Sequence, residues 1–358
     1  MSKTYRVAAI GAGFASVSPL PTLRDYPGVE LVAICTRNQA SAEKACEQFG
    51  GKPYTDIHSM LANEEIDIVY VATPVVNHVD AVLAAINAGK HVLCEKPLAL
   101  TAAEAKQLRD AAQAKGVVNK VAFNMRFFAA ANTIAEQIRQ GVLGELRHAS
   151  INLWVSQPES TQKPFGWFND EAQGGGVLLA LGSHYLDLIR HWCGDIKSVS
   201  AFLRTWVPEL ADANGKMHTV TSDDGMAIML ELSNGAVVQI HISGQIKPGT
   251  GARVELYGSN GSIVQDGMAA IKIATADDKM LREIPLQPIA YSDVVKRAAG
   301  EPGMVHGYRI AFAYAVEQLI EAIEGRTSAG ADFEDGYHCN RALDAVKLAS
   351  RERRVVDL

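Results

Sequence analysis

The stretch VAAIGAGFAS at residues 7–16 decides how the first part of this chain folds. Its first residues are apolar and indicate a buried strand, and Gly11 and Gly13 follow at once in the pattern G-x-G-x-x-S. The pattern is informative where a strand precedes it and a helix follows it. In that setting Gly11 permits a tight turn, and Gly13 lets backbone N–H groups approach a pyrophosphate at the positive end of the helix.

The residues of this turn are therefore candidates for binding a dinucleotide. We expect Gly11, Gly13, Phe14 and Ala15 to contribute to the phosphate site, while Ser16 stands where a third glycine is often found. A tight turn that binds no ligand is the alternative explanation of the same glycines.

Apolar runs alternate regularly with helix-like segments over the first third of the chain. Strands are predicted at residues 6–10, 29–35, 66–72, 91–94 and 117–123, and helical segments at 41–49, 78–89 and 101–116. This alternation is typical of a parallel sheet that is covered by helices on both faces. Residues 1–123 are thus predicted to form a doubly wound α/β domain of the Rossmann type.

The pattern changes after residue 123. Longer runs of alternating polarity predict strands within residues 146–156, 197–207, 225–244, 252–266 and 270–276, with hairpin turns at the two Ser-Asn-Gly sequences. Helices are predicted at residues 130–140, 177–192, 308–324 and 336–352. Residues 124–358 are therefore expected to form an α+β domain with a mostly antiparallel open sheet, whose last helix could pack back on the first domain.

Composition narrows the classes of partner. The 358 residues carry a net charge of −6 with no basic block, which disfavours nucleic acid, and no apolar run approaches the ~20 residues that span a membrane. The five cysteines are scattered, so we expect no disulfide framework and no metal site, and a cytoplasmic location. The N-terminal residues are interpreted as mature protein rather than a signal peptide.

The end of the second predicted strand bears on the choice of dinucleotide. It reads Cys35-Thr36-Arg37-Asn38 and contains no acid that could bond the ribose 2′-hydroxyl of NAD. Thr36 and Arg37 therefore favour NADP over NAD, because an arginine at this point can accommodate a 2′-phosphate. If Arg37 only stacks on adenine, either cofactor is acceptable.

The stretch HVLCEKPLAL at residues 91–100 places Glu95, Lys96 and Pro97 directly after the fourth predicted strand. Open α/β sheets bind their ligands at this carboxyl edge. A lysine held there can bond a substrate hydroxyl and, close to a positively charged nicotinamide, help an alcohol to lose its proton. A solvated surface lysine is the alternative.

Together these motifs resemble the glucose–fructose oxidoreductase/inositol dehydrogenase (Gfo/Idh/MocA) family. The resemblance rests on the glycine turn, Thr73-Pro74 with His78, AGKHVLCEKPLA, Asn124 with Arg126-Phe127, and the later GGG…GSHYLD, and it extends along the whole chain. It implies hydride transfer between a nicotinamide and a secondary alcohol of a sugar, an inositol or a related molecule. It also implies a homodimer or homotetramer formed through the sheet of the second domain.

The resemblance further implies roles for individual residues. Lys96 would lie beside both the nicotinamide and the substrate and act with His184 in catalysis. The cofactor site would include Thr73, Pro74, His78, Glu95, Lys96 and Asn124, and the substrate site would include Arg126, Trp167, His184 and Asp187. Specificity is expected to depend on the loops at residues 155–170 and 207–221.

One position departs from the family pattern. Many members carry an aspartate four residues before the histidine of the GGG helix, and here that position is Ala180. His184 can still act as a general base, because the ordinary pKa of histidine is near neutral. Asp187 could in part replace the missing acid from the same helix face. Alternatively, it could pair with an arginine such as Arg190 or cap a neighbouring segment.

Two other functions fit the same sequence features. A glycoside-cleaving enzyme could use a tightly held nicotinamide for transient oxidation followed by elimination. A nucleotide-binding sensor that has lost catalysis would be consistent with Ala180, although Lys96 and His184 argue against it.

Overall fold

The structure is a computed structural model that describes residues 3–156, 163–267, 270–303 and 305–358. It divides into two compact units. The first comprises residues 1–124 and 290–338, and the second comprises residues 125–289 and 339–358. The expected specificity loop at residues 155–170 therefore falls partly outside the described residues.

The first unit is built on a six-stranded sheet in the order β3-β2-β1-β4-β5-β6, and all of its strand pairs are parallel. The strands are β1 (Tyr5–Ile10), β2 (Val29–Cys35), β3 (Lys52–Tyr54), β4 (Ile68–Val71), β5 (His91–Cys94) and β6 (Asn119–Val121). This order is that of a dinucleotide-binding Rossmann sheet, and it confirms the predicted fold of the first domain. The sequence reading missed β3, which is short and only partly buried.

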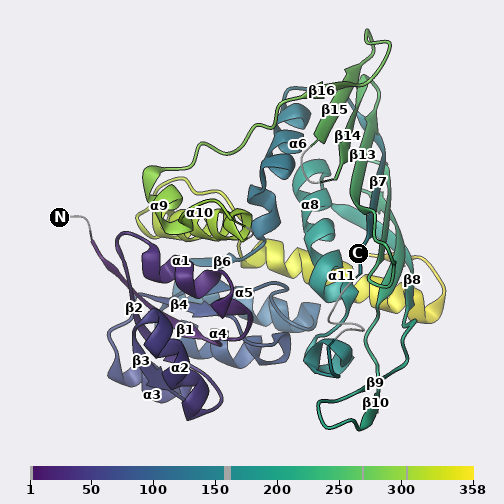
Figure 1. Cartoon of the computed structure of the whole chain (residues 1–358). Helices are drawn as coiled ribbons and strands as arrows, with labels where there is room; N and C mark the ends of the chain where they lie inside the picture. The colour runs from purple at the N-terminus through teal and green to yellow at the C-terminus, as the bar shows by residue number, and fades with distance from the viewer. Residues whose placement is uncertain (1–2, 157–162, 268–269, 304) are drawn as a thin grey trace. The chain divides into compact units, whose positions relative to one another are not determined.

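Helices connect these strands in the usual way (Figure 1). They are α1 (Pro19–Asp25), α2 (Gln39–Phe49), α3 (Ile57–Asn63), α4 (His78–Asn87) and α5 (Ala102–Lys115). The limits of α5 follow from local chemistry, because Thr101 and Glu104 form a capping box at its start and Gly116 adopts a left-handed conformation at its end.

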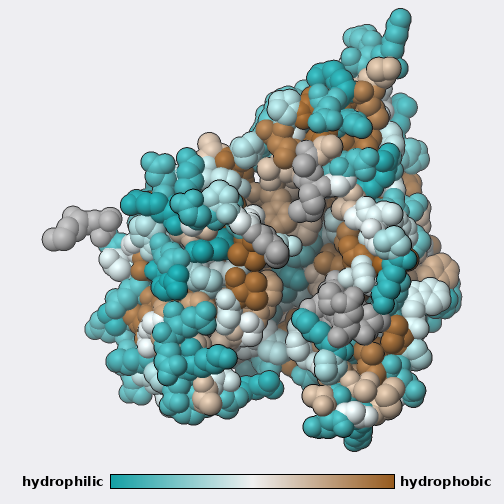
Figure 2. Space-filling view, viewed as in Figure 1, coloured by the Kyte–Doolittle hydropathy of each residue, from teal (hydrophilic) through white to brown (hydrophobic). Residues whose placement is uncertain are grey.

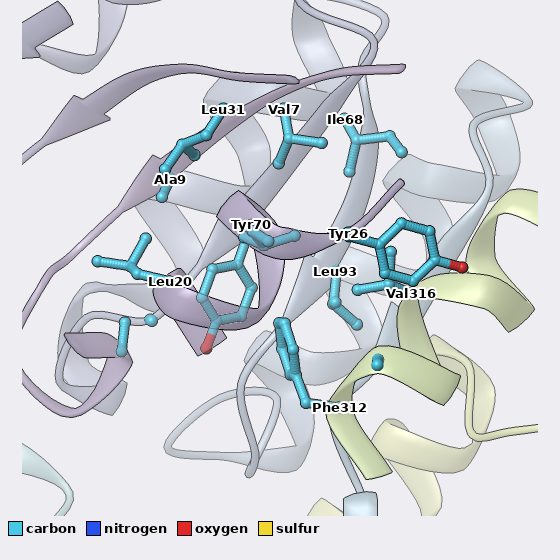
Figure 3. Packing of buried hydrophobic residues seen from close by; sticks show 14 of the residues in the cluster. Val7, Ala9, Leu20, Tyr26, Leu31, Ile68, Tyr70, Leu93, Phe312 and Val316 are labelled. Carbon is cyan, nitrogen blue, oxygen red and sulfur yellow. The ribbon is translucent and has the colours of Figure 1, made fainter. Parts of the chain in front are cut away.

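The first unit's opening segment ends at residue 124, close to the predicted boundary, but the predicted extent of the second domain, residues 124–358, needs a correction. Residues 290–338, with helices α9 (Asp293–Ala299) and α10 (His306–Ile323), belong to the first unit and not to the second. The reason is hydrophobic packing, because Val295, Phe312 and Val316 join the core formed by the strands of the parallel sheet. Figure 3 shows Phe312 of α10 beside Tyr70 of β4, and their ring centroids are 5.1 Å apart in an edge-to-face arrangement.

The second unit contains a nine-stranded sheet in the order β16-β15-β14-β13-β7-β12-β11-β8-β17. Its strands are β7 (Leu146–Trp154), β8 (Ile196–Arg204), β11 (Gly225–Leu232), β12 (Val237–Ser243), β13 (Gly251–Gly258), β14 (Gly261–Asp266), β15 (Ala270–Thr275), β16 (Arg282–Ile284) and β17 (Val356–Asp357). Every pair is antiparallel except β7 with β12, so the predicted mostly antiparallel sheet is confirmed. A separate hairpin joins β9 (Glu209–Ala211) to β10 (Met217–Thr219).

Helices cover one face of this sheet (Figure 1). α6 (Ala129–Arg139) packs near β14 and β15 and also contacts α8 (Ser183–Cys193). α11 (Phe333–Glu352) contributes its residues from Cys339 onward to this unit, where the hydroxyl of Ser350 accepts a hydrogen bond from the backbone N–H of Leu203 in β8. The opposite face is left with half-exposed side chains such as Met229, Val237 and Tyr257.

The hydropathy of the surface agrees with the burial of apolar side chains in the core. On the face drawn in Figure 2, the surface of the first unit is predominantly hydrophilic. Among the described residues, no helix is both long enough and apolar enough to cross a bilayer.

Candidate active site

The glycine turn after β1 has the geometry that a phosphate site requires. Gly11 has a φ of +98°, and a Cβ there would lie 2.5 Å from the carbonyl oxygen of Ala72 at the end of β4. Only glycine therefore fits between the two strand ends. A Cβ on Gly13 would contact nothing within 4 Å, so the backbone at that position faces open space.

The helix expected immediately after this turn is interrupted. Residues Phe14–Ser16 form a short 3₁₀ helix (η1), and α1 begins only at Pro19. The cause is the sequence Ser18-Pro19-Leu20-Pro21, because proline lacks an N–H and favours the first turn of a new helix. Any phosphate contact here must come from the turn and η1; in η1 Ala15 is buried and Phe14 is 60% exposed.

Thr36 and Arg37 directly follow β2, as the sequence predicted. The backbone N–H of Thr36 bonds to Tyr54 of β3, and its hydroxyl donates to the carbonyl of Asn38 at 2.9 Å. Arg37 is exposed. The carbonyl of Cys35, the last residue of β2, accepts a hydrogen bond from the N–H of Gly11, which ties this strand end to the glycine turn.

His78 has a different place from the one expected. Its side chain is completely buried, with Nε2 3.0 Å from the carbonyl of Thr73 and Nδ1 3.1 Å from the carbonyl of Pro97. Burial lowers the pKa of His78, which favours the neutral ring. The contact of His78 with a cofactor stays a prediction. In the structure His78 holds the loop after β4 against the loop after β5.

At two positions predicted to bind the cofactor, the first unit has a buried side-chain oxygen atom. Neither atom has a hydrogen-bond partner among the described residues. They are Oγ1 of Thr73, which follows β4, and Oδ1 of Asn124, which follows β6. Buried polar atoms are normally satisfied, so a partner such as a bound ligand is needed at these points. The half-buried Pro74 continues the Thr73 segment.

The carboxyl end of β5 carries Glu95 and Lys96. Glu95 is buried, and the hydroxyl of Tyr70 donates a 2.7 Å hydrogen bond to its Oε1. Burial raises the pKa of Glu95, while the Tyr70 hydrogen bond and the charge of Lys96 oppose that rise. Lys96 is half-buried, and its charge lies near enough to Glu95 to act on the pKa of that carboxyl. Tyr70 escaped the sequence reading because it looks like any apolar strand residue.

These features fit a dinucleotide. The glycine turn, the two oxygen atoms on Thr73 and Asn124, and the Glu95-Lys96 pair all follow strands at the carboxyl edge of one parallel sheet. That edge is where such folds bind nucleotides.

In the second unit, the helix that carries His184 begins with a π-helical segment. Leu178–Gly182 (η6) has π-helical geometry and continues directly into α8. Such segments are rare and occur often at functional sites. Ala180 and His184 are both half-buried, whereas Tyr185 and Leu186 are buried.

Arg126 and Asp187 form a pair that the sequence did not reveal. Nε and Nη2 of Arg126 donate hydrogen bonds of 2.8 and 2.6 Å to the two carboxylate oxygens of Asp187. The side chains are only 6% and 2% exposed. The two side chains thus hold each other in place, and their contact with the substrate stays a prediction. Arg190, the other partner considered for Asp187, pairs with Asp195 instead.

The remaining substrate candidate, Trp167, is 50% exposed and contacts Phe168 edge-on. Two acids nearby in this unit were missed by the sequence reading. Asp223 accepts a 2.8 Å hydrogen bond from the N–H of Leu178. Asp224 accepts hydrogen bonds from the N–H groups of Trp206 and Val207. The sequence does not reveal these contacts, because an acid in a connecting segment carries no pattern that indicates which distant N–H group it accepts from.

A Rossmann unit with a glycine turn and a lysine at the carboxyl edge defines a nicotinamide-dependent oxidoreductase as the class of this protein. Residues 5–123 match the family of oxidoreductases with an NAD-binding Rossmann fold, and residues 131–264 match the GFO/IDH/MocA C-terminal domain. The chain belongs to the Gfo/Idh/MocA oxidoreductase family, as its motifs predicted.

Relatives show the kinds of reaction found in the family. D-glucoside 3-dehydrogenase of Escherichia coli is 32% identical over 259 residues, which cover 68% of this chain and 71% of that protein. Levoglucosan dehydrogenase of Pseudarthrobacter phenanthrenivorans is 29% identical, covering 91% of this chain and 88% of that one. A solved levoglucosan dehydrogenase in complex with NADH and levoglucosan superposes with a TM-score of 0.86 at 25% identity, over 99% of both chains. These relatives support an NAD-dependent sugar oxidoreductase.

Proposed function

We propose that this chain transfers a hydride between a nicotinamide cofactor and a secondary alcohol of a sugar or glycoside. The observation that carries the proposal is the carboxyl edge of the parallel sheet, where Gly13 leaves open space and Thr73 presents a buried oxygen without a partner among the described residues. The relatives, which are sugar dehydrogenases by name, supply the substrate class.

Two side chains are proposed to handle the proton. The bound nicotinamide supplies the chemistry of accepting or donating a hydride. Lys96 binds the reacting hydroxyl through its ammonium, and His184 takes the hydroxyl proton as the alcohol becomes a ketone. The balance is complete, because one hydride leaves the carbon and one proton leaves the oxygen.

Ala180 determines how His184 works in this proposal. No acid stands at that position to orient the imidazole or to stabilise its charge. The imidazole of His184 then serves as the general base without a carboxylate at position 180.

Substitution of the two groups tests these roles. Lys96→Ala and His184→Ala should each lower kcat by at least about 100-fold, as expected for loss of a general acid–base group. NADH binding, measured by fluorescence titration, should persist in His184→Ala, because the nucleotide site belongs to the first unit. Near-normal rates in both variants on a sugar that the unmodified enzyme oxidises would disprove the roles.

We also propose a preference for NADP over NAD. Its support is the strand end at Thr36 and Arg37, where Arg37 is exposed and no acid is present to meet a ribose 2′-hydroxyl. The ratio of kcat/KM for NADP to that for NAD should fall about tenfold or more in Arg37→Ala, the loss expected for one charged phosphate contact. An unchanged ratio would show that Arg37 does not read the 2′ position.

Assembly and location complete the proposal. We propose a homodimer or homotetramer formed through the face of the nine-stranded sheet that carries Met229, Val237 and Tyr257. These residues alternate with buried ones along their strands, so they share one face. Analytical ultracentrifugation of Val237→Lys against the unmodified chain tests this. A cytoplasmic location is proposed because all five cysteines are free thiols.

A further inference from the structure

We propose that Asp223 is a positioning residue that fixes the start of the helix carrying His184. The inference rests on the proposed role of His184, and all the contacts that support it lie within the second unit. It also gives a reason for Gly176, the last of the three consecutive glycines that precede this helix.

Asp223 holds the first helical residues by two hydrogen bonds. Its backbone carbonyl accepts from the N–H of Val177 at 3.0 Å, and its Oδ2 accepts from the N–H of Leu178 at 2.8 Å. The first N–H groups of a helix have no partner within the helix, so an acceptor from another segment both satisfies them and fixes the helix start. His184 lies six positions after Leu178 on the same continuous helix.

The glycines make this approach possible. Gly176 has a φ of +103°, and a Cβ there would lie 2.5 Å from Oδ1 of Asp223. A Cβ on Gly175 would lie 2.2 Å from the carbonyl oxygen of Phe168. Any side chain at position 176 would therefore displace the carboxylate from the helix start, and any side chain at position 175 would displace the neighbouring 3₁₀ segment, Trp167–Asn169.

The segment that carries Asp223 is itself anchored on both sides. The hydroxyl of Ser222 donates to the carbonyl of Phe168 at 2.9 Å, and the carboxylate of Asp224 accepts from the N–H groups of Trp206 and Val207. Asp223 thus joins the helix start to a fixed framework.

The charge of the group is compatible with this role. Burial raises the pKa of Asp223 to about 7, and the neighbouring Asp224 adds to the rise, while the hydrogen bond from Leu178 and the charge of Lys347 oppose it. Lys347, on α11, also lies 3.6 Å from the carboxylate of Glu171. The carboxylate therefore accepts most strongly above neutral pH, where a dehydrogenase also needs a neutral histidine.

Three variants test the proposal. Asp223→Ala removes the side-chain acceptor, Asp223→Asn keeps an acceptor oxygen without the charge, and Gly176→Ala displaces the carboxylate without removing it. We expect Asp223→Ala and Gly176→Ala to lower kcat by about 10- to 100-fold, the loss typical of a misplaced catalytic group. Asp223→Asn should recover kcat at pH 8 to within about threefold of the unmodified enzyme. Asp278→Ala, which removes an acid that accepts the N–H of Thr275 in an exposed turn, is the matched control.

Two further measurements, NADH affinity and the kcat of a double variant, distinguish a positioning role of Asp223 from a general loss of folding. The affinity for NADH, measured by fluorescence, should stay unchanged in all variants, because the nucleotide site belongs to the first unit. The double variant Gly176→Ala/Asp223→Ala should lose no more kcat than the worse single variant, because both changes break the same contact. If Asp223→Ala does not fold, Asp223→Asn and Gly176→Ala still decide the matter.

The outcomes also distinguish this inference from the proposed function. If His184→Ala keeps its activity, the role of His184 fails, whatever Asp223 does. If His184→Ala is inactive but Asp223→Ala and Gly176→Ala both retain kcat within twofold, the role of His184 stands and the positioning role of Asp223 is overturned. Equal losses in folded Asp223→Asn and Asp223→Ala would also overturn it.

Discussion

Arg126 and Asp187 form a buried ion pair with two hydrogen bonds between the guanidinium and the carboxylate. The pair joins the 3₁₀ segment Asn124–Phe127, which follows β6, to the middle of α8. A charge buried this deeply is tolerated because its partner is present and well aligned. The pair therefore fixes α8 from its middle, and the hydrogen bonds of Asp223 fix the same continuous helix at its start.

Breaking this pair should be costly. Asp187→Asn removes the carboxylate charge that faces the buried guanidinium, and we expect it to lower the free energy of unfolding by about 3–5 kcal/mol in urea denaturation. Arg190→Ala is the control, because Asp195, its partner, is 62% exposed, and such pairs contribute less than about 1 kcal/mol. Equal effects of the two substitutions would show that the buried pair does not hold α8.

The two glycines of the nucleotide turn should respond differently to alanine. Gly11→Ala places a Cβ against Ala72 at a positive φ, so we expect a loss of at least about 1–3 kcal/mol in stability. Gly13→Ala points its methyl group into open space, so stability should change by less than about 1 kcal/mol.

The affinity for NADH provides a test of the role of Gly13 that is independent of stability. Gly13→Ala should weaken NADH binding in a fluorescence titration, because its methyl group occupies the space that a diphosphate needs. A folded Gly13→Ala variant that binds NADH with unchanged affinity would show that the turn does not hold a diphosphate.

Removal of the Tyr70 hydroxyl should have an effect that depends on pH. The hydrogen bond to Glu95 favours the ionised carboxylate, so Tyr70→Phe raises the pKa of Glu95 still further. The cost to stability should therefore grow as pH rises and reach about 1.5–3 kcal/mol where Glu95 is ionised. Urea denaturation at pH 5 and pH 8 measures it.

Ionisation of Asp223 should make the free energy of unfolding depend on pH, and the direction follows from its pKa. Its pKa is about 7 in the folded chain and about 3.9 in an unfolded one, so the folded state binds the proton more tightly. This group therefore lowers stability progressively as pH rises from about 4 to about 7. The difference in stability between the unmodified chain and Asp223→Asn should change across that window and level off above it. Parallel curves across that window would contradict the elevated pKa.

The sequence by itself determined the parts that depend on local pattern. Alternating apolar runs and helical segments predicted the doubly wound sheet, because strands buried on both faces must be apolar throughout. The turn at Gly11 and the Glu95-Lys96 pair were found because each directly follows an apolar strand, and the chain order alone brings such strand ends to one edge.

Tertiary structure alone decided the contacts between residues that are distant in sequence. Nothing in the chain order indicates that α10 completes the first unit, that His78 is enclosed by carbonyl groups, or that Arg126 pairs with Asp187. Asp223 reaches Leu178 across 45 residues of sequence. These contacts depend on which buried polar groups meet once the apolar faces have packed, and hydrophobic periodicity carries no information about that choice.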